Sequence, residues 1–164
     1  MIRKTKFCSI LLLIATLALI NISCGSSKSN LNTTESVMTV KMNINYTSDY
    51  CGGAYPSEDI LAALKKERPL SKKKFFILKV GDDREKMIEV TTANDGSCTM
   101  ELQPGKYQIF LPEKMSSPTG KFISQEACDN WKKTPNGTFD VTTPDQELIA
   151  KVHKTCNPCQ EPAR

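Results

Sequence analysis

The chain has 164 residues and a formal net charge of +4, and three of its 22 basic side chains are Arg3, Lys4 and Lys6 at the N-terminus. From residue 24 onward, 19 basic side chains are balanced by 18 acidic ones, which leaves a net charge of +1. This balance excludes the basic field on which nucleic-acid binding depends, so we expect no nucleic-acid partner. The length fits one domain.

The first 23 residues have the layout of a secretory signal peptide. The three basic residues precede an almost wholly apolar core at residues 10–20, and the short segment 21–23 follows it. The core is shorter than the ~20 apolar residues that a membrane span needs. We therefore expect residues 1–23 to be removed during export. The alternatives are an uncleaved anchor helix and an ordinary signal that is cleaved elsewhere.

Cys24 follows this signal directly and resembles the lipid-bearing cysteine of bacterial lipoproteins. In that family a small residue precedes the cysteine, as Ser23 does here, although Asn21 departs from the usual leucine. The resemblance implies that Cys24 becomes the first residue of the mature protein and carries a diacylglyceryl group. The acyl chains of this group would insert into membrane lipid. Gly25 and Ser26 are not the acidic residues that keep some lipoproteins at the inner membrane. We therefore expect anchoring at the outer membrane, facing the periplasm or the cell surface.

The rest of the chain divides into a polar tether at residues 24–36, a domain at 37–160 and a tail at 161–164. Residues 38–46 alternate between apolar and polar side chains, the pattern of a half-buried strand. Similar patterns with turn signals between them predict seven strands, at 38–46, 74–80, 87–91, 98–102, 107–111, 138–142 and 147–153. Short helices are expected at 57–67 and 124–131. The fold prediction is an all-β, seven-stranded antiparallel sandwich with one or two inserted helices.

Residues 92–107 carry a more specific pattern. Asp95-Gly96 and Pro104-Gly105 each predict a tight turn, and the strand between them alternates. The segment resembles a hairpin of carboxypeptidase regulatory-like and transthyretin-like domains. The resemblance implies a transthyretin-like sandwich and a non-catalytic accessory role, without naming a ligand. Cys98 stands where that family has an aromatic residue, which implies a buried small side chain.

Export would place the domain's cysteines in an oxidising compartment, where disulfides persist. We expect Cys51 to pair with one of Cys156 and Cys159, and Cys128 to pair with the other, leaving Cys98 over. One alternative is a zinc site made of His153, Cys156 and Cys159 with Cys128 or Cys51. Another is a redox-active Cys-x-x-Cys pair, which would lack the helix that should follow such a motif.

No motif for catalysis is present, so we expect no catalytic residue, no cofactor and no metal. His153 is the only histidine and lies in the outward register of its strand. The run Lys72–Lys74 indicates a solvated strand entry rather than a lipid or phosphate site. The predicted function is a non-enzymatic, lipid-anchored envelope module that binds an envelope protein or supports the surface. The alternatives are a periplasmic metal-binding protein and a carbohydrate-binding accessory using Trp131 and Tyr55.

Overall fold

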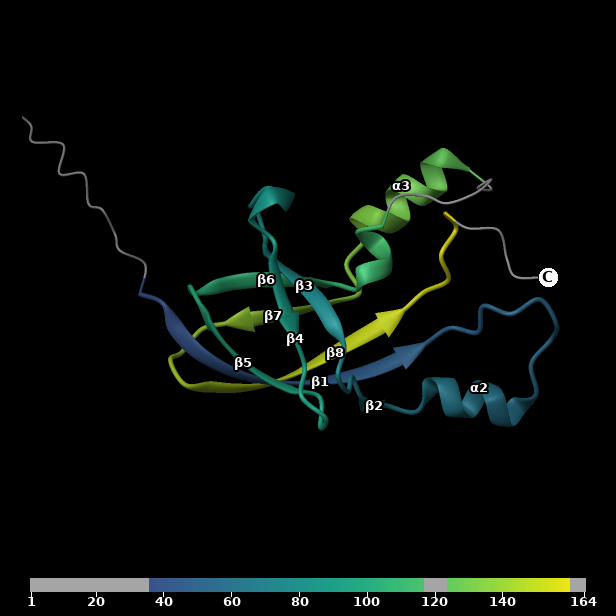
Figure 1. Ribbon diagram of the computed structural model, residues 1–164, viewed down its shortest axis with the longest axis horizontal. Coiled ribbons are helices and arrows are strands. Elements are labelled where there is room, and N and C mark those ends of the chain that lie inside the picture. The colour runs from purple at the N-terminus through teal and green to yellow at the C-terminus, as the bar shows by residue number, and fades with distance from the viewer. Residues whose placement is uncertain (1–35, 117–123, 160–164) are drawn as a thin grey trace, which may run out of the picture. The chain divides into compact units, whose positions relative to one another are not determined.

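The structure is a computed structural model that describes residues 36–116 and 124–159. The expected signal, Cys24, most of the tether and the tail at 161–164 lie outside these residues. The described part is a β-sandwich of two four-stranded sheets (Figure 1), which confirms the predicted fold class. The first sheet contains β1 (Met38–Ser48), β2 (Arg68–Pro69), β5 (Ser97–Leu102) and β8 (Gln146–Lys154). The second contains β4 (Ile88–Thr91), β3 (Lys74–Lys79), β6 (Gly105–Phe110) and β7 (Gly137–Val141), in that spatial order.

The core lies between the two sheets and is built by the alternation seen in the sequence. Val40, Met42 and Ile44 of β1 are buried, while their neighbours along the strand point outward. Phe75 and Ile109 fill the same core from the second sheet. Burying one such side chain stabilises the fold by about 1.5–3 kcal/mol, so this layer is the main source of stability.

β1 and β8 pair in parallel, which corrects the prediction of a wholly antiparallel sandwich. Their register runs from Val40 beside Gln146 to Ser48 beside Lys154. The opposite edge of β1 is occupied by β5 and β2, both antiparallel. Parallel strands need a long connection between them, and here almost the whole domain supplies it. Because both strands run the same way, the residues that follow each of them emerge at the same end of the sandwich (Figure 1).

The predicted hairpin at 92–107 is wrong, although both of its turns exist. β5 pairs with β1 in the first sheet, whereas β4 and β6 belong to the second. Each turn therefore carries the chain from one sheet to the other. Gly96 has φ +82° and Gly105 has φ +147°, backbone conformations that side chains with a Cβ rarely adopt. Tight turns of this kind let Leu102 and Tyr107 both point into the core from facing sheets.

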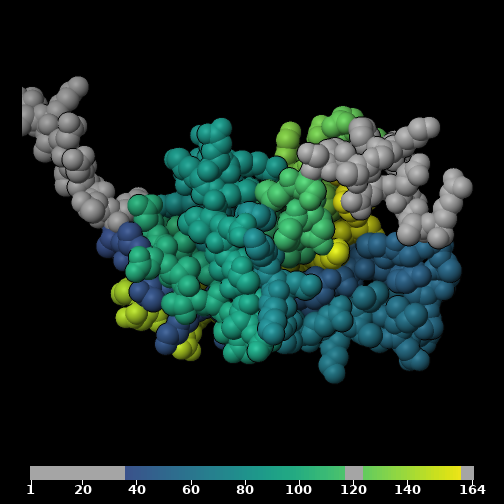
Figure 2. All heavy atoms as spheres, viewed as in Figure 1, coloured from purple at the N-terminus to yellow at the C-terminus, as the bar shows by residue number. Residues whose placement is uncertain are grey.

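Four short elements join the strands. The helix α2 (Glu58–Lys65) falls within the expected 57–67, and α3 (Gln125–Lys133) overlaps the expected 124–131. The 3₁₀ turns η1 (Arg84–Lys86) and η2 (Pro112–Lys114), like the two-residue strand β2, were not predicted. Within the described residues, none of the helices combines the length and apolarity required for a bilayer span. In Figure 2 the blue segment carrying α2 lies next to the yellow C-terminal residues.

Candidate functional site

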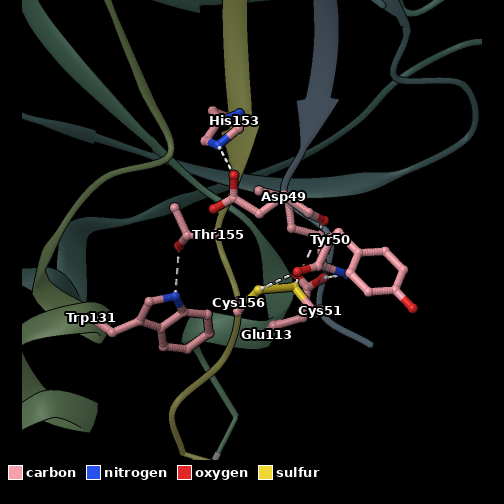
Figure 3. The surroundings of a disulfide bond; sticks show 9 residues. Asp49, Tyr50, Cys51, Glu113, Trp131, His153, Thr155 and Cys156 are labelled. Carbon is pink, nitrogen blue, oxygen red and sulfur yellow. Dashed lines mark hydrogen bonds and ion pairs between the residues drawn. A yellow bond between two sulfur atoms is a disulfide. The ribbon is translucent and has the colours of Figure 1, made fainter. Parts of the chain in front are cut away.

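One end of the sandwich gathers most of the residues singled out in the sequence. We call it the stapled end, and it consists of the loop at 49–57, η2, α3 and the tail at 155–159 (Figure 3). Disulfides join Cys51 to Cys156 and Cys128 to Cys159, with Cα atoms 5.4 and 4.9 Å apart. Both separations fall in the usual range for a disulfide. The chain immediately after β8 is therefore fastened to two different parts of the domain.

The two bridges agree with the expected pairing and select one of the two arrangements that the sequence left open. Cys51 is exposed, whereas Cys128 and Cys159 are buried. Because the four sulfurs are bonded in two pairs, none is a thiolate available to zinc. No cluster of three or more metal-ligating side chains occurs among residues 36–116 and 124–159. With both disulfides formed, the metal-binding alternative thus lacks its sulfur ligands.

Lys114 of η2 holds the C-terminal end of α3. Its ammonium donates hydrogen bonds of 2.6 Å to the carbonyls of both Trp131 and Thr134, and it lies 4.6 Å from the centre of the Trp131 ring. The side chain is only 2% exposed. Burial, with the positive charge of Arg84 nearby, lowers the pKa of Lys114, and Glu113 opposes this shift. A cation here binds carbonyls that the helix leaves without intrahelical partners.

His153 lies in a hydrogen-bonded chain that ties β8 to the end of β1. Its Nδ1 is 2.9 Å from Thr47 Oγ1, and its Nε2 is 3.1 Å from Asp49 Oδ1. The side chains of His153 and Asp49 are about half exposed, at 48% and 51%. The outward position agrees with the register expected from the sequence. Both ring nitrogens are used in holding two strand ends together, beside the Cys51–Cys156 bridge (Figure 3).

The two aromatic residues considered for sugar binding differ in their surroundings. Trp131 is partly buried, its indole N–H donates to Thr155 Oγ1 at 2.8 Å, and Lys114 lies against its ring. Tyr55 is 95% exposed in the loop before α2. A sugar-stacking platform needs an open aromatic face. Lys114 and Thr155 instead give Trp131 a packing role at the stapled end.

Asn136 joins the two sheets, and sequence reasoning missed it. Its Nδ2 donates to the carbonyl of His153, and its Oδ1 accepts from the N–H of Leu111, both at 2.9 Å. Its backbone N–H donates to the Ile109 carbonyl at 2.7 Å, and its carbonyl accepts from His153 at 2.8 Å. The only local signal is a polar residue between Pro135 and Gly137, which is typical of any turn.

Cys98 is the one cysteine of the described residues that forms no disulfide. It is half-buried on β5 and packs against the core, near the position expected for a small interior side chain. Burial raises the pKa of its thiol to about 11. A thiol with so high a pKa is almost fully protonated at neutral pH and reacts slowly.

No family model and no curated protein matches this sequence. Among solved structures, a DUF3823 family protein from Parabacteroides merdae has a TM-score of 0.33 and 15% identity, over 71% of this chain and 47% of that one. A double mutant of the shaft pilin SpaA from Lactobacillus rhamnosus GG has a TM-score of 0.33 and 13% identity, over 74% of this chain and 52% of that one. The chain thus spans about half the length of each. At these values the likeness carries no argument about function.

Proposed function

We propose that the chain is an exported, non-enzymatic accessory module of the bacterial cell envelope, anchored by acyl chains on Cys24. The observation that carries the proposal is the pair of disulfides at the stapled end. Disulfides of this kind persist in oxidising compartments and are rare in the bacterial cytosol. They accord with the signal layout of residues 1–23, which on its own implies export.

The stapled end also fits the demands on a small domain outside the cytoplasm. The bridges close loops with sequence separations of 105 and 31 residues. The loop-closure relation gives a stabilisation of about 5 kcal/mol for the longer loop and about 4 kcal/mol for the shorter. A domain braced in this way withstands local unfolding of its C-terminal segment, which suits a binding or supporting role in the cell envelope. We retain the transthyretin-like subtype and the outer membrane as parts of the proposal.

The non-enzymatic part of the proposal rests on how the candidate catalytic groups are used. His153 is engaged by Thr47 and Asp49 at a solvated strand end. Cys98 has a raised pKa, the opposite of an activated nucleophile. Such groups support the packing of this domain rather than acyl or phosphoryl transfer.

The test is expression of the full chain in a bacterium that matures lipoproteins, followed by fractionation and intact-mass analysis. We expect the wild-type protein in the membrane fraction, starting at Cys24, with acyl chains attached and four of the five remaining cysteines oxidised. The Cys24→Ala variant should leave the membrane fraction. The matched control Cys98→Ala, which removes a cysteine that forms no disulfide, should remain there.

Two results would contradict the proposal. One is intact protein beginning at Met1 in the cytosol with an unmodified Cys24. The other is Cys24→Ala protein that stays fully membrane-bound. A metal count on the same preparation tests the alternative, because stoichiometric zinc together with four free thiols would favour a metal-binding protein.

A further inference from the structure

A groove of about 550 Å³ lies beside the stapled end and serves none of the roles described above. Its lining comes from β1, β2, the start of β3, η2 and the end of β8, and includes Tyr46, Arg68, Leu70, Lys73, Leu111 and Pro112. We call it the β2–η2 groove. Its volume falls within the range of sites that bind small molecules.

The positive charge of the groove is only partly balanced. Lys74 forms an ion pair of 2.7 Å with Glu89, and Lys154 forms one of 2.8 Å with Glu113. Arg68 and Lys73 have no carboxylate partner within residues 36–116 and 124–159. The guanidinium of Arg68 lies over the Tyr46 ring, 5.2 Å from its centre. Two cations are thus left available to an anion.

The backbone that carries one of these cations is fixed before any ligand arrives. The N–H of Lys73 donates to Thr92 Oγ1 at 3.0 Å, and the carbonyl of Lys73 accepts from the N–H of Thr92 at the same distance. Thr92 Oγ1 also donates to the carbonyl of Leu70, whose N–H donates to Ile44 at 2.9 Å. Thr92 is only 4% exposed. A preorganised site loses less entropy on binding than a mobile one.

Apart from Ser71 and Glu113, the remaining lining of the groove is apolar. Leu70 and Leu111 are nearly buried, at 6% and 5% exposed, and Pro112 and the Tyr46 ring lie beside them. An inorganic anion would leave this surface in water, whereas a neutral apolar molecule would leave Arg68 and Lys73 unpaired. Only a ligand with both parts satisfies the whole groove.

We propose that the β2–η2 groove binds a small anionic amphiphile, a carboxylate or phosphate group attached to an apolar chain or ring. The anionic group contacts Arg68 and Lys73, and the apolar body lies on Leu70, Leu111 and Pro112. This inference goes beyond the proposed accessory role, and it holds whether or not Cys24 is acylated. The lysine run that the sequence indicated as a solvated strand entry then supplies one of the binding cations.

The test is a titration of the chain from residue 24, carrying Cys24→Ala so that no acyl chain competes. Sodium octanoate is the probe, followed by calorimetry and amide chemical shifts. We expect saturable binding with shifts at Leu70, Lys73 and Leu111. Octanamide, the neutral equivalent, should bind at least about tenfold more weakly, and acetate, which lacks the chain, should not saturate.

Variants distinguish a defined site from general attraction to a basic surface. Arg68→Gln and Lys73→Gln should each raise the octanoate dissociation constant by about tenfold, because each removes a charge-assisted hydrogen bond. The control Lys106→Gln removes an exposed lysine of β6 outside the groove and should leave it unchanged. Both groove residues are exposed, so the variants should fold.

Several results would overturn the proposal. They are octanamide binding as tightly as octanoate, equal weakening by Lys106→Gln, and shifts confined to residues outside the groove. A further arm uses vesicles of neutral lipid with and without phosphatidylglycerol. Binding to the anionic vesicles without binding of octanoate would assign the groove's charge to a membrane surface and refute a small-molecule site.

Discussion

Replacing Asn136 with alanine tests whether the two sheets depend on this single side chain. Asn136 is 8% exposed and contacts residues that lie in both halves of the sandwich. Its amide nitrogen donates to His153 at the end of β8, and its amide oxygen accepts from Leu111 just after β6. Asn136→Ala removes both hydrogen bonds but leaves the two backbone hydrogen bonds of residue 136 in place.

The expected cost follows from the groups left behind. The variant leaves the N–H of Leu111 and the carbonyl of His153 without their partners, and a buried unsatisfied group costs roughly 1–3 kcal/mol. The two together should lower the free energy of unfolding by about 2–6 kcal/mol. For a domain of this size, that corresponds to a fall in Tm on the order of 10 °C or more.

The assay is urea unfolding without reductant, followed by the fluorescence of Trp131, the only tryptophan. Asn43→Ala on the exposed face of β1 is the matched control and should change stability by less than about 0.5 kcal/mol. Hydrogen exchange should be faster at the amide of Leu111 in the Asn136 variant. A loss no larger than that of Asn43→Ala, with unchanged exchange at Leu111, would refute the reasoning.

Two further predictions concern side chains with shifted pKa values. Burial raises the pKa of Cys98 to about 11. At pH 8, iodoacetamide should therefore alkylate the native protein roughly 100-fold more slowly than the urea-unfolded protein, and the native rate should rise with pH towards 11. Equal rates for the native and unfolded proteins would contradict this prediction. Lys114→Met should lower the free energy of unfolding by about 1–3 kcal/mol, because two carbonyls at the end of α3 lose their donor. The Trp131 emission should shift as well, since the ammonium lies 4.6 Å from its ring. The control is Lys133→Met, which replaces an exposed lysine of α3. Equal effects of both variants would count against a capping role for Lys114.

The strands could be predicted because the signal for a strand is local. Alternating side chains from Met38 to Tyr46 point to opposite faces of any extended chain, whatever its partner, so the buried face of β1 followed directly. The helix at 57–67 was predicted from charges at its ends and apolar spacing, and the helix at 124–131 from apolar spacing alone; both signals are also local properties. The short strand β2 was missed because two residues, one of them proline, carry no alternation.

Which strands pair with each other was decided by the tertiary structure. Alternation in β1 and β8 is the same for parallel and antiparallel pairing, so the parallel register could not be predicted from it. The turns at Gly96 and Gly105 were identified correctly, but a turn reverses the chain equally well within one sheet or between two. Similarly, the sequence allows Cys51 to pair with either Cys156 or Cys159, and the course of the C-terminal tail places Cys156 beside it.

The proposed functional features were likewise partly predictable from the sequence and partly decided by the tertiary structure. Export and the acylation of Cys24 are predictions from residue order alone, because a secretion signal is defined by the order of its charged, apolar and small residues. The sheet-joining contacts of Asn136 and the β2–η2 groove depend on segments that are distant in the chain, such as Arg68, Leu111 and Lys154. No local pattern encodes them, because the energies that bring them together come from burial in the shared core.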